Sequence, residues 1–210
     1  MEKLIAKGAE AELYLIKWNG LKAIKKFRKP KKYRHPILDF QLRKTRTNHE
    51  ADIIQRVKNY GVSTPILYHV NNESGIIIME YIEGEKVRDI VDILGEEERQ
   101  RLFRKIGYYS GLLHKNGIIH GDLTTSNIII HSKRIVFIDF GLSEVSYEVE
   151  KRGVDLNLMN RMLTSTHFSY LEMLLKAFME GYRESLGDEA EKALNRMEDV
   201  SKRGRYIEKE

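Results

Sequence analysis

The spacing of apolar residues changes near residue 84, and this change limits the fold more than any other feature of the sequence. Before it, apolar residues alternate in short runs separated by turn residues, including the hairpin-forming pair Asn19-Gly20. After it, they recur at helical spacing, as between Leu102 and Leu113. The sequence therefore predicts an α+β protein whose sheet and helices are segregated along the chain.

The region before the change contains more than one kind of element. Its alternating residues predict strands near 2–7, 11–18 and 21–28, and residues 39–61 then show helical spacing that ends at Gly61. Two further apolar runs, 66–68 and 76–79, predict two more strands. We expect a twisted antiparallel sheet with one helix.

Two lobes follow from this pattern. We expect a β-rich N-terminal lobe over residues 1–82 and a reduced, mainly helical C-terminal lobe over 83–210. Within the second lobe, the short apolar runs 128–130 and 135–138 predict a strand hairpin, and the sequence from Asp155 to about residue 203 predicts helices. Ligand sites favour the junction of such lobes.

The composition excludes several classes of protein. The chain has 210 residues and no cysteine, so a disulfide framework and thiolate catalysis are excluded. No apolar run approaches the roughly 18 residues that span a membrane, and the N-terminus lacks the apolar core of a signal peptide. We expect a cytoplasmic protein.

The net charge of +5 is unevenly distributed. Residues 22–46 contain eleven lysines and arginines against one acid, Asp39, a local balance of +10. The tail adds Lys202, Arg203 and Arg205. Basic clusters attract phosphates or acidic partners, although a solvated surface is the alternative for any single lysine.

The stretch "HGDLTTSN", residues 120–127, carries the clearest chemical signal. Asp122 and Asn127 flank a polar loop that leads into an apolar strand, and Asp139 follows the next predicted strand. Pairing of these strands would bring Asn127 close to Asp139, and oxygen donors of this kind suit Mg²⁺. Asp122 would then serve as the catalytic base for a hydroxyl group.

Polar strand-capping turns are the alternative for each stretch alone. The order H-x-D-x-x-x-x-N followed by D-F-G is, however, the catalytic pair of the protein-kinase signature. Both motifs occur here with an apolar strand in the expected place. We therefore interpret Asp122 as catalytic and Asn127 and Asp139 as metal ligands.

A phosphate-binding lysine is expected on the third predicted strand. Lys25 closes the sequence Ala-Ile-Lys, which matches the V-A-I-K motif of kinases. Alternation sends Lys25 and Lys26 to opposite faces, so only one of them can serve, and the motif favours Lys25. Its expected partner is Glu50, although Thr47-x-x-Glu50 also fits a capping box. We favour the ion pair.

The remaining nucleotide-binding candidates lie in two segments. In place of G-x-G-x-x-G the first hairpin has only Gly8-Ala9-Glu10-Ala11, which leaves space for phosphate but should be stiffer and carries an acid. The second segment begins at Met79, where an adenine-binding connection should run. The candidate residues are Ile5, Ala6, Lys7, Gly8, Ala9, Glu10, Ala11, Glu12, Leu13, Met79, Glu80 and Ile82, with the backbone of Glu80 and Ile82 facing the purine edge.

Together these residues resemble the protein-kinase superfamily and, more closely, one small atypical branch. The segments "KGAEA", "YRHPILD", "RKTRTNHEA", "HGDLTTSN", "IDFGLS", "GVDL" and the terminal "RGR" resemble the kinase subunit of the KEOPS (EKC) complex, the p53-related protein kinase family. The resemblance runs from about residue 4 to residue 206. The compact ends are typical of archaeal members.

The resemblance implies a minimal bilobal protein-kinase-like fold whose N-terminal lobe binds ATP with Mg²⁺ or Mn²⁺. It implies an atypical Ser/Thr kinase with ATPase activity, which supports threonylcarbamoyladenosine formation next to the anticodon of tRNA. The implied partners are the ASKHA-fold threonylcarbamoyl-transferase subunit, a further small KEOPS subunit, and tRNA, indirectly or through the basic tail. Carried over, Asp122 is the base, Asn127 and Asp139 bind metal, and Lys25 and Glu50 clamp phosphate.

The chain also departs from ordinary kinases. Gly121 replaces the arginine of H-R-D, which normally pairs with a phosphorylated activation loop. Thr124 replaces the lysine that steadies the γ-phosphate, and no A-P-E motif follows Asp139. We expect Asp155 to anchor the loop 121–124 by accepting hydrogen bonds from the backbone of that loop. Two alternatives to a KEOPS subunit stay open: a free-standing Ser/Thr kinase, and a tRNA-binding scaffold with a structural nucleotide site.

Overall fold

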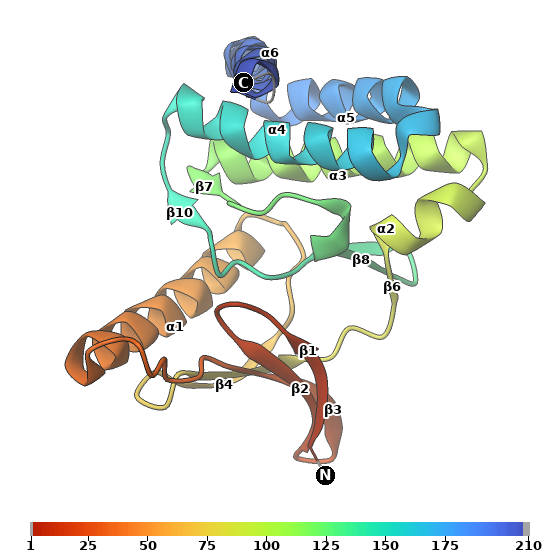
Figure 1. The fold of residues 1–210 in the computed structure, drawn as a ribbon. Coiled ribbons are helices and arrows are strands. Elements are labelled where there is room, and N and C mark those ends of the chain that lie inside the picture. The colour runs from red at the N-terminus through yellow and green to blue at the C-terminus, as the bar shows by residue number, and fades with distance from the viewer. Residues whose placement is uncertain (1, 208–210) are drawn as a thin grey trace. The chain divides into compact units, whose positions relative to one another are not determined.

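The computed structural model describes the backbone of residues 2–207 and the side chains up to Arg203 (Figure 1). The chain forms two compact units. The sheet unit consists of the residues up to Arg56 together with Thr64–Glu83, and the helical unit consists of Val57–Ser63 together with the chain from Gly84 onward. Each unit is described by itself.

The sheet unit is a five-stranded antiparallel sheet with one long helix. Its strand order is β1-β2-β3-β5-β4. The elements are β1 (Lys3–Lys7), β2 (Glu12–Trp18), β3 (Leu21–Phe27), α1 (Pro36–Asn59), β4 (Leu67–Asn71) and β5 (Ile76–Glu80). The predicted sheet and helix are confirmed, with α1 starting three residues before the predicted position.

The β2–β3 hairpin fixes which side chains share a face of the sheet. Asn19 and Gly20 both have positive φ, as a two-residue hairpin turn requires, and Trp18 pairs with Leu21. Directly opposed residues lie on the same face, so Tyr14 shares a face with Lys25, and Leu13 shares the other face with Lys26. Apolar side chains pack on the Lys25 face around Ile16, Ala23 and Ile78.

The helical unit contains four long helices and two small sheets. The sheets have the orders β6-β8-β9 and β10-β7. The elements are β6 (Glu85–Lys86), α2 (Val87–Ile90), η1 (Val91–Ile93), α3 (Glu96–Lys115), β7 (Ile118–Ile119), η2 (Thr125–Asn127), β8 (Ile128–His131), β9 (Arg134–Phe137), β10 (Glu144–Val145), α4 (Val149–Thr166), η3 (Phe168–Tyr170), α5 (Leu171–Leu186), η4 (Gly187–Glu189) and α6 (Ala190–Ile207).

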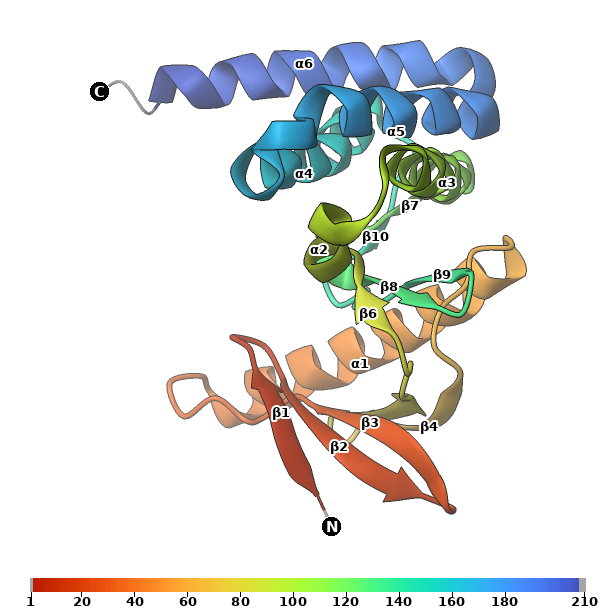
Figure 2. The same ribbon diagram turned by 90° about the vertical axis from the view of Figure 1, so that its right-hand side faces the viewer.

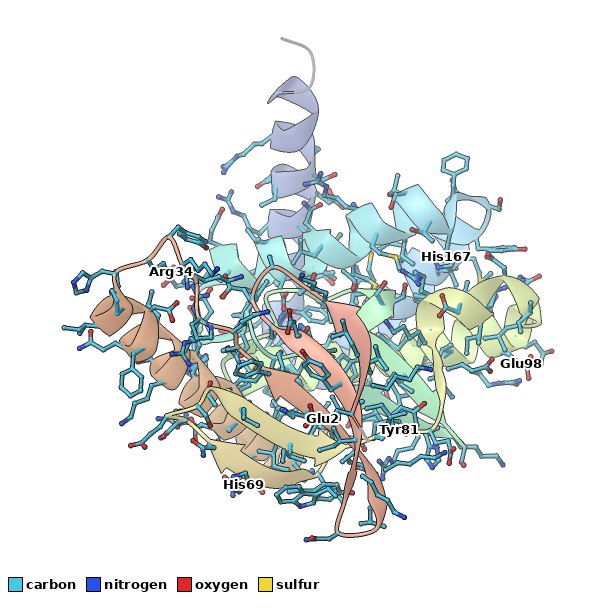
Figure 3. The ribbon with its side chains drawn as sticks, turned by 60° about the horizontal axis from the view of Figure 1, so that its bottom comes forward. Glu2, Arg34, His69, Tyr81, Glu98 and His167 are labelled. Atoms are coloured by element: carbon cyan, nitrogen blue, oxygen red, sulfur yellow. The ribbon has the colours of Figure 1, made fainter. Side chains whose placement is uncertain are left out.

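Glycines allow α3 and α5 to lie side by side, and α6 packs along α4 (Figure 2). A Cβ atom at Gly107 or Gly181 would collide with the backbone of the opposite helix. The large side chains of Phe103 and Phe178 are fully buried in this part of the core. At the start of α3, Glu98 (Figure 3) accepts the Gly95 backbone N–H at 3.1 Å, which caps the helix.

One segment belongs to a different unit than its sequence position suggests. Residues 57–63 comprise the last three residues of α1 and the four residues after it, yet they belong to the helical unit. The backbone N–H of Phe137 donates to Ser63 O at 2.9 Å, which ties this segment to the end of β9. Within the part of the chain that the structure describes, no helix is both long and apolar enough to cross a membrane.

Candidate functional site

The loop before β8 holds Asp122 and Asn127 together. Asn127 Nδ2 donates to Asp122 Oδ2 at 2.7 Å and to the Asp122 backbone carbonyl at 3.0 Å. Because both bonds use the amide nitrogen, the amide orientation is fixed and Asn127 Oδ1 remains as an acceptor for a cation. The predicted base and one predicted metal ligand are therefore joined by a direct hydrogen bond.

The β8–β9 hairpin positions Asp139, the third predicted residue, just after the point where β9 pairs with the start of β8. Ile128 pairs with Phe137, and Ile138 N–H donates to Asn127 O at 2.9 Å. Asp139 comes directly after this bond, so the predicted strand pairing is confirmed. Asp139 has φ of +60°, a strained conformation for a residue other than glycine, and such strain clusters at functional sites.

Asp155 of α4 anchors the loop, as the sequence predicts. Its carboxylate accepts the backbone N–H groups of His120 at 2.8 Å and Gly121 at 2.9 Å. Burial alone would raise the pKa of Asp155, but the hydrogen bond from His114 and the nearby positive charge hold that pKa below its usual value. The buried carboxylate is therefore ionised and binds the loop by charge-assisted hydrogen bonds.

A buried histidine and tyrosine support Asp155, and the sequence did not reveal them. His114 Nε2 lies 3.1 Å from Asp155 Oδ2, and His114 Nδ1 lies 2.8 Å from the Tyr182 hydroxyl. Because a carboxylate only accepts hydrogen bonds, Nε2 carries a proton. Both residues have ordinary helical spacing within α3 and α5, which gave no signal beyond core packing.

His120 contributes to the loop as a neutral group. It is fully buried, and burial lowers the pKa of its imidazole. Its Nδ1 accepts the backbone N–H of Asp122 at 3.3 Å, and its ring packs on Phe140 with centroids 4.7 Å apart. The histidine of the motif therefore holds Asp122 and the Asp139-Phe140-Gly141 segment in place.

In the sheet unit the predicted Lys25–Glu50 pair is wrong. Lys26 Nζ lies 2.6 Å from Glu50 Oε1, and both side chains are buried. Lys25 points to the other face of β3, where its Nζ donates to Glu2 (Figure 3) at 2.7 Å. The motif match identified the strand but was one residue out of register, because α1 covers the face that carries Lys26.

The competing capping-box interpretation of Glu50 is also wrong. α1 begins at Pro36, so Thr47 lies in the middle of the helix and not at its start. The Thr47 hydroxyl donates to Arg43 O at 2.7 Å instead. Glu50 therefore forms an ion pair with Lys26, and not the predicted pair with Lys25.

Two hydrogen bonds and one ion pair hold the loop between β1 and β2 in place. Gly8 N–H donates to Ala11 O at 2.9 Å, Lys31 Nζ donates to Ala9 O at 2.5 Å, and Arg46 forms an ion pair with Glu10. The hydrogen bond from Arg46 holds the pKa of Glu10 below its usual value. The negative charge of this loop is therefore balanced by its own unit. The other candidates of this segment, Ile5, Ala6, Lys7, Glu12 and Leu13, lie on β1 and β2.

The predicted adenine-binding connection is the end of β5. Met79 and Ile82 are buried. The backbone N–H of Glu80 donates to Ile66 O at 2.8 Å, so this N–H is already used within the sheet unit. A purine contact through the Glu80 N–H is therefore disfavoured, and the predicted contact through the backbone of Ile82 stays a prediction.

The tail is partly described. Arg203 Nη1 lies 3.9 Å from Glu150 Oε1, an exposed ion pair within the helical unit. The side chain of Arg205 lies outside the described residues. Among the described residues, no group of three or more His, Asp or Glu side chains is arranged to hold a metal ion by itself.

The chain matches known families and structures. The RIO-domain family model matches residues 8–152. The KEOPS complex subunit Bud32 of Pyrococcus abyssi is 42% identical, over 99% of this chain and 97% of that protein. A probable bifunctional tRNA threonylcarbamoyladenosine biosynthesis protein of Methanothermobacter thermautotrophicus is 40% identical over 98% of this chain, and the chain spans 37% of that protein.

The fold is also found in solved structures. The Rio2 kinase of Chaetomium thermophilum, solved with ADP, Mg²⁺ and phosphoaspartate, has a TM-score of 0.65 at 14% identity, covering 94% of this chain and 70% of that one. This likeness shows a protein-kinase-like fold, as the sequence predicted. The chain therefore belongs to the RIO-domain kinase family, in the branch that contains the KEOPS complex subunit Bud32.

Proposed function

We propose that this chain is an ATP-dependent Ser/Thr protein kinase and ATPase subunit of a KEOPS complex. In that role it supports threonylcarbamoyladenosine formation next to the anticodon of tRNA. The observation that carries the proposal is the bonded pair of Asp122 and Asn127 beside Asp139, in a chain 42% identical to a KEOPS subunit. The pair supplies a base and oxygen ligands in one loop.

The residues present fit a magnesium nucleotide. Mg²⁺ prefers a few protein oxygens completed by phosphate and water, and Asn127 Oδ1 with the Asp139 carboxylate would supply the protein oxygens. The bound ion would neutralise charge on the β- and γ-phosphates. Lys26, oriented by Glu50, would hold the α- and β-phosphates, and Asp122 would orient the attacking hydroxyl or water and accept its proton.

The geometry at Gly121 favours an enzyme without a phosphorylation switch. Gly121 has φ of +78°, and a Cβ atom there would collide with the Leu142 carbonyl. An arginine, which ordinary kinases have at this position, is therefore excluded by both conformation and space. Control by a partner protein fits such a site better than control by a phosphorylated loop.

The proposed partners rest on the resemblance to the KEOPS kinase subunit. We infer that the chain binds the ASKHA-fold threonylcarbamoyl-transferase subunit and a further small KEOPS subunit, with tRNA bound indirectly or through the tail. The long relatives are named as bifunctional, and the chain spans 37% of their length. A kinase-like region fused to a further region supports a close association of this chain with a protein of a second activity.

ATP turnover in the presence of the transferase subunit tests the proposal. We expect the native chain to release phosphate in a Mg²⁺-dependent reaction, and Asp122→Ala to lose at least about a hundredfold of that rate. Asp52→Ala, on the exposed surface of α1, is the matched control and should behave as the native chain. Unchanged turnover in Asp122→Ala would overturn the assigned mechanism.

The tRNA scaffold is disfavoured by a specific observation. Several of the basic side chains of residues 22–46 already form ion pairs within the sheet unit. Arg34 and Arg43 pair with Asp39, and Arg46 pairs with Glu10. A free-standing kinase would phosphorylate an added protein without partners, at a rate comparable with self-phosphorylation. That result would favour it over the KEOPS subunit.

A further inference from the structure

Two buried basic side chains, Lys26 and Arg28, form ion pairs with Glu50. The phosphate-binding pair of a kinase needs only one of them, the lysine. Lys26 Nζ lies 2.6 Å from Glu50 Oε1, and Arg28 Nη2 lies 2.6 Å from Glu50 Oε2. Arg28 is only 2% exposed and Glu50 only 1%. Two buried cations therefore share one buried carboxylate.

The backbone keeps the two bases on one side of the sheet. Arg28 follows Lys26 by two residues, and successive side chains of a strand alternate between faces. The Arg28 backbone N–H donates to Gly75 O at 2.9 Å, so the strand pairing continues to this residue. Arg28 and Lys26 therefore reach the same carboxylate from neighbouring positions on that face.

The second base has more donors than the carboxylate uses. Arg28 Nε and Nη1 are buried, and neither has a hydrogen-bond partner among the described residues. Buried charged groups normally satisfy their hydrogen-bond donors, and the ion pair with Glu50 leaves these two donors of Arg28 unused. Local ion pairing therefore does not account for a second buried cation at this position.

We propose that Arg28 is a positioning residue for the phosphates of the nucleotide. Arg28 forms an ion pair with one oxygen of Glu50. The carboxylate therefore attracts the Lys26 ammonium less strongly than it would without Arg28. The positive charge of Arg28 also strengthens the attraction of this cluster for anions. This inference rests on the proposed function of the site as an ATP site.

The charge of Arg28 should affect the binding of charged and uncharged ligands differently. A charge acts strongly at short range where water is excluded, and its effect grows with the charge of the ligand. Loss of the Arg28 charge should therefore weaken binding of a triphosphate and leave the uncharged nucleoside unaffected. A residue that only packed the core would change the binding of both ligands.

Equilibrium binding of Mg-ATP and of adenosine to the purified chain tests the inference. Arg28→Gln keeps a hydrogen-bond donor without the charge, and Arg28→Lys keeps the charge. We expect Arg28→Gln to lose about tenfold in Mg-ATP affinity with adenosine affinity unchanged, and Arg28→Lys to retain the native preference for ATP. Arg56 is an exposed arginine on α1 that pairs with Asp52, so Arg56→Gln is the matched control and should bind both ligands as the native chain does.

The outcomes separate this inference from the proposed function. If the native chain bound neither ligand, the ATP site itself would be wrong and the role of Arg28 would fall with it. If the native chain bound Mg-ATP and Arg28→Gln kept the native ratio of ATP to adenosine affinity, only the role of Arg28 would be overturned. Should Arg28→Gln not fold, Arg28→Lys decides alone, because a tenfold loss of ATP preference with the charge retained contradicts the charge account.

Discussion

For single residues, the sequence predicted which side chains of the loop lie close together better than it predicted their tertiary contacts. Asp122, Asn127 and Asp139 were predicted from motif order, and the hydrogen bonds of the loop support that interpretation. The predicted lysine partner of Glu50 was wrong by one residue, because Lys26 and not Lys25 forms that ion pair. Both faces of β3 carry apolar neighbours and a lysine, so the sequence did not show which face α1 covers.

The lysine correction gives a matched pair of variants. We expect Lys26→Met to lower ATP turnover by about a hundredfold, because it removes the charge that is buried against Glu50. Lys25→Met should leave turnover within about twofold of native, since Lys25 contacts Glu2 on the opposite face. Phosphate release with the transferase subunit present is the measurement. The reverse ranking of the two variants would restore the motif-based prediction.

At the scale of elements, local patterns predicted the long helices and strands, while the tertiary supports of the loop stayed hidden. The two-residue turn at Asn19-Gly20 and the β8–β9 hairpin follow from turn chemistry and alternation. The support of Asp155 by His114 and Tyr182 joins α3, α4 and α5. Helical periodicity does not specify which helices meet, so the sequence could not predict this contact.

The Asp155 anchor predicts a pH dependence of stability. The folded-state pKa of Asp155 lies below the usual value of 3.8 for an aspartate, so its contribution to stability is fully present above that pH and is lost as the pH falls through the folded-state value. We expect Asp155→Asn to lower the free energy of unfolding by about 3 kcal/mol at pH 7, because a buried charge partner is removed. Urea unfolding at pH 7, 5, 4 and 3 measures the gap between the native chain and the variant. The gap should narrow only below about pH 4, and a gap that stayed constant down to pH 3 would contradict the assignment.

The close packing of α3 on α5 is tested by adding one methyl group. A Cβ atom at Gly181 would collide with the Arg104 carbonyl, so we expect Gly181→Ala to lower the free energy of unfolding by about 3 kcal/mol. Gly61, with φ of +81° and open space around it, is the control for backbone strain alone. Gly61→Ala should cost about 1 kcal/mol. Equal costs in chemical denaturation would show that the helices do not approach so closely.

For the whole molecule, the candidate residues are divided between the two units. The sheet unit holds Lys26 and Glu50, and the helical unit holds Asp122, Asn127 and Asp139. The division into a β-rich and a helical part followed from the change in periodicity near residue 84. The assignment of residues 57–63 to the helical unit did not, because it depends on the long-range bond between Ser63 and Phe137.

The central claim is that phosphoryl transfer at Asp122 supports tRNA modification by a KEOPS complex. The most direct measurement is the rate of threonylcarbamoyladenosine formation on tRNA by a reconstituted complex that contains either the native chain, Asp122→Ala or the control Asp52→Ala. We expect all three chains to assemble with the transferase subunit, and only Asp122→Ala to lose the activity. Modification by the assembled Asp122→Ala complex at the native rate would contradict the account.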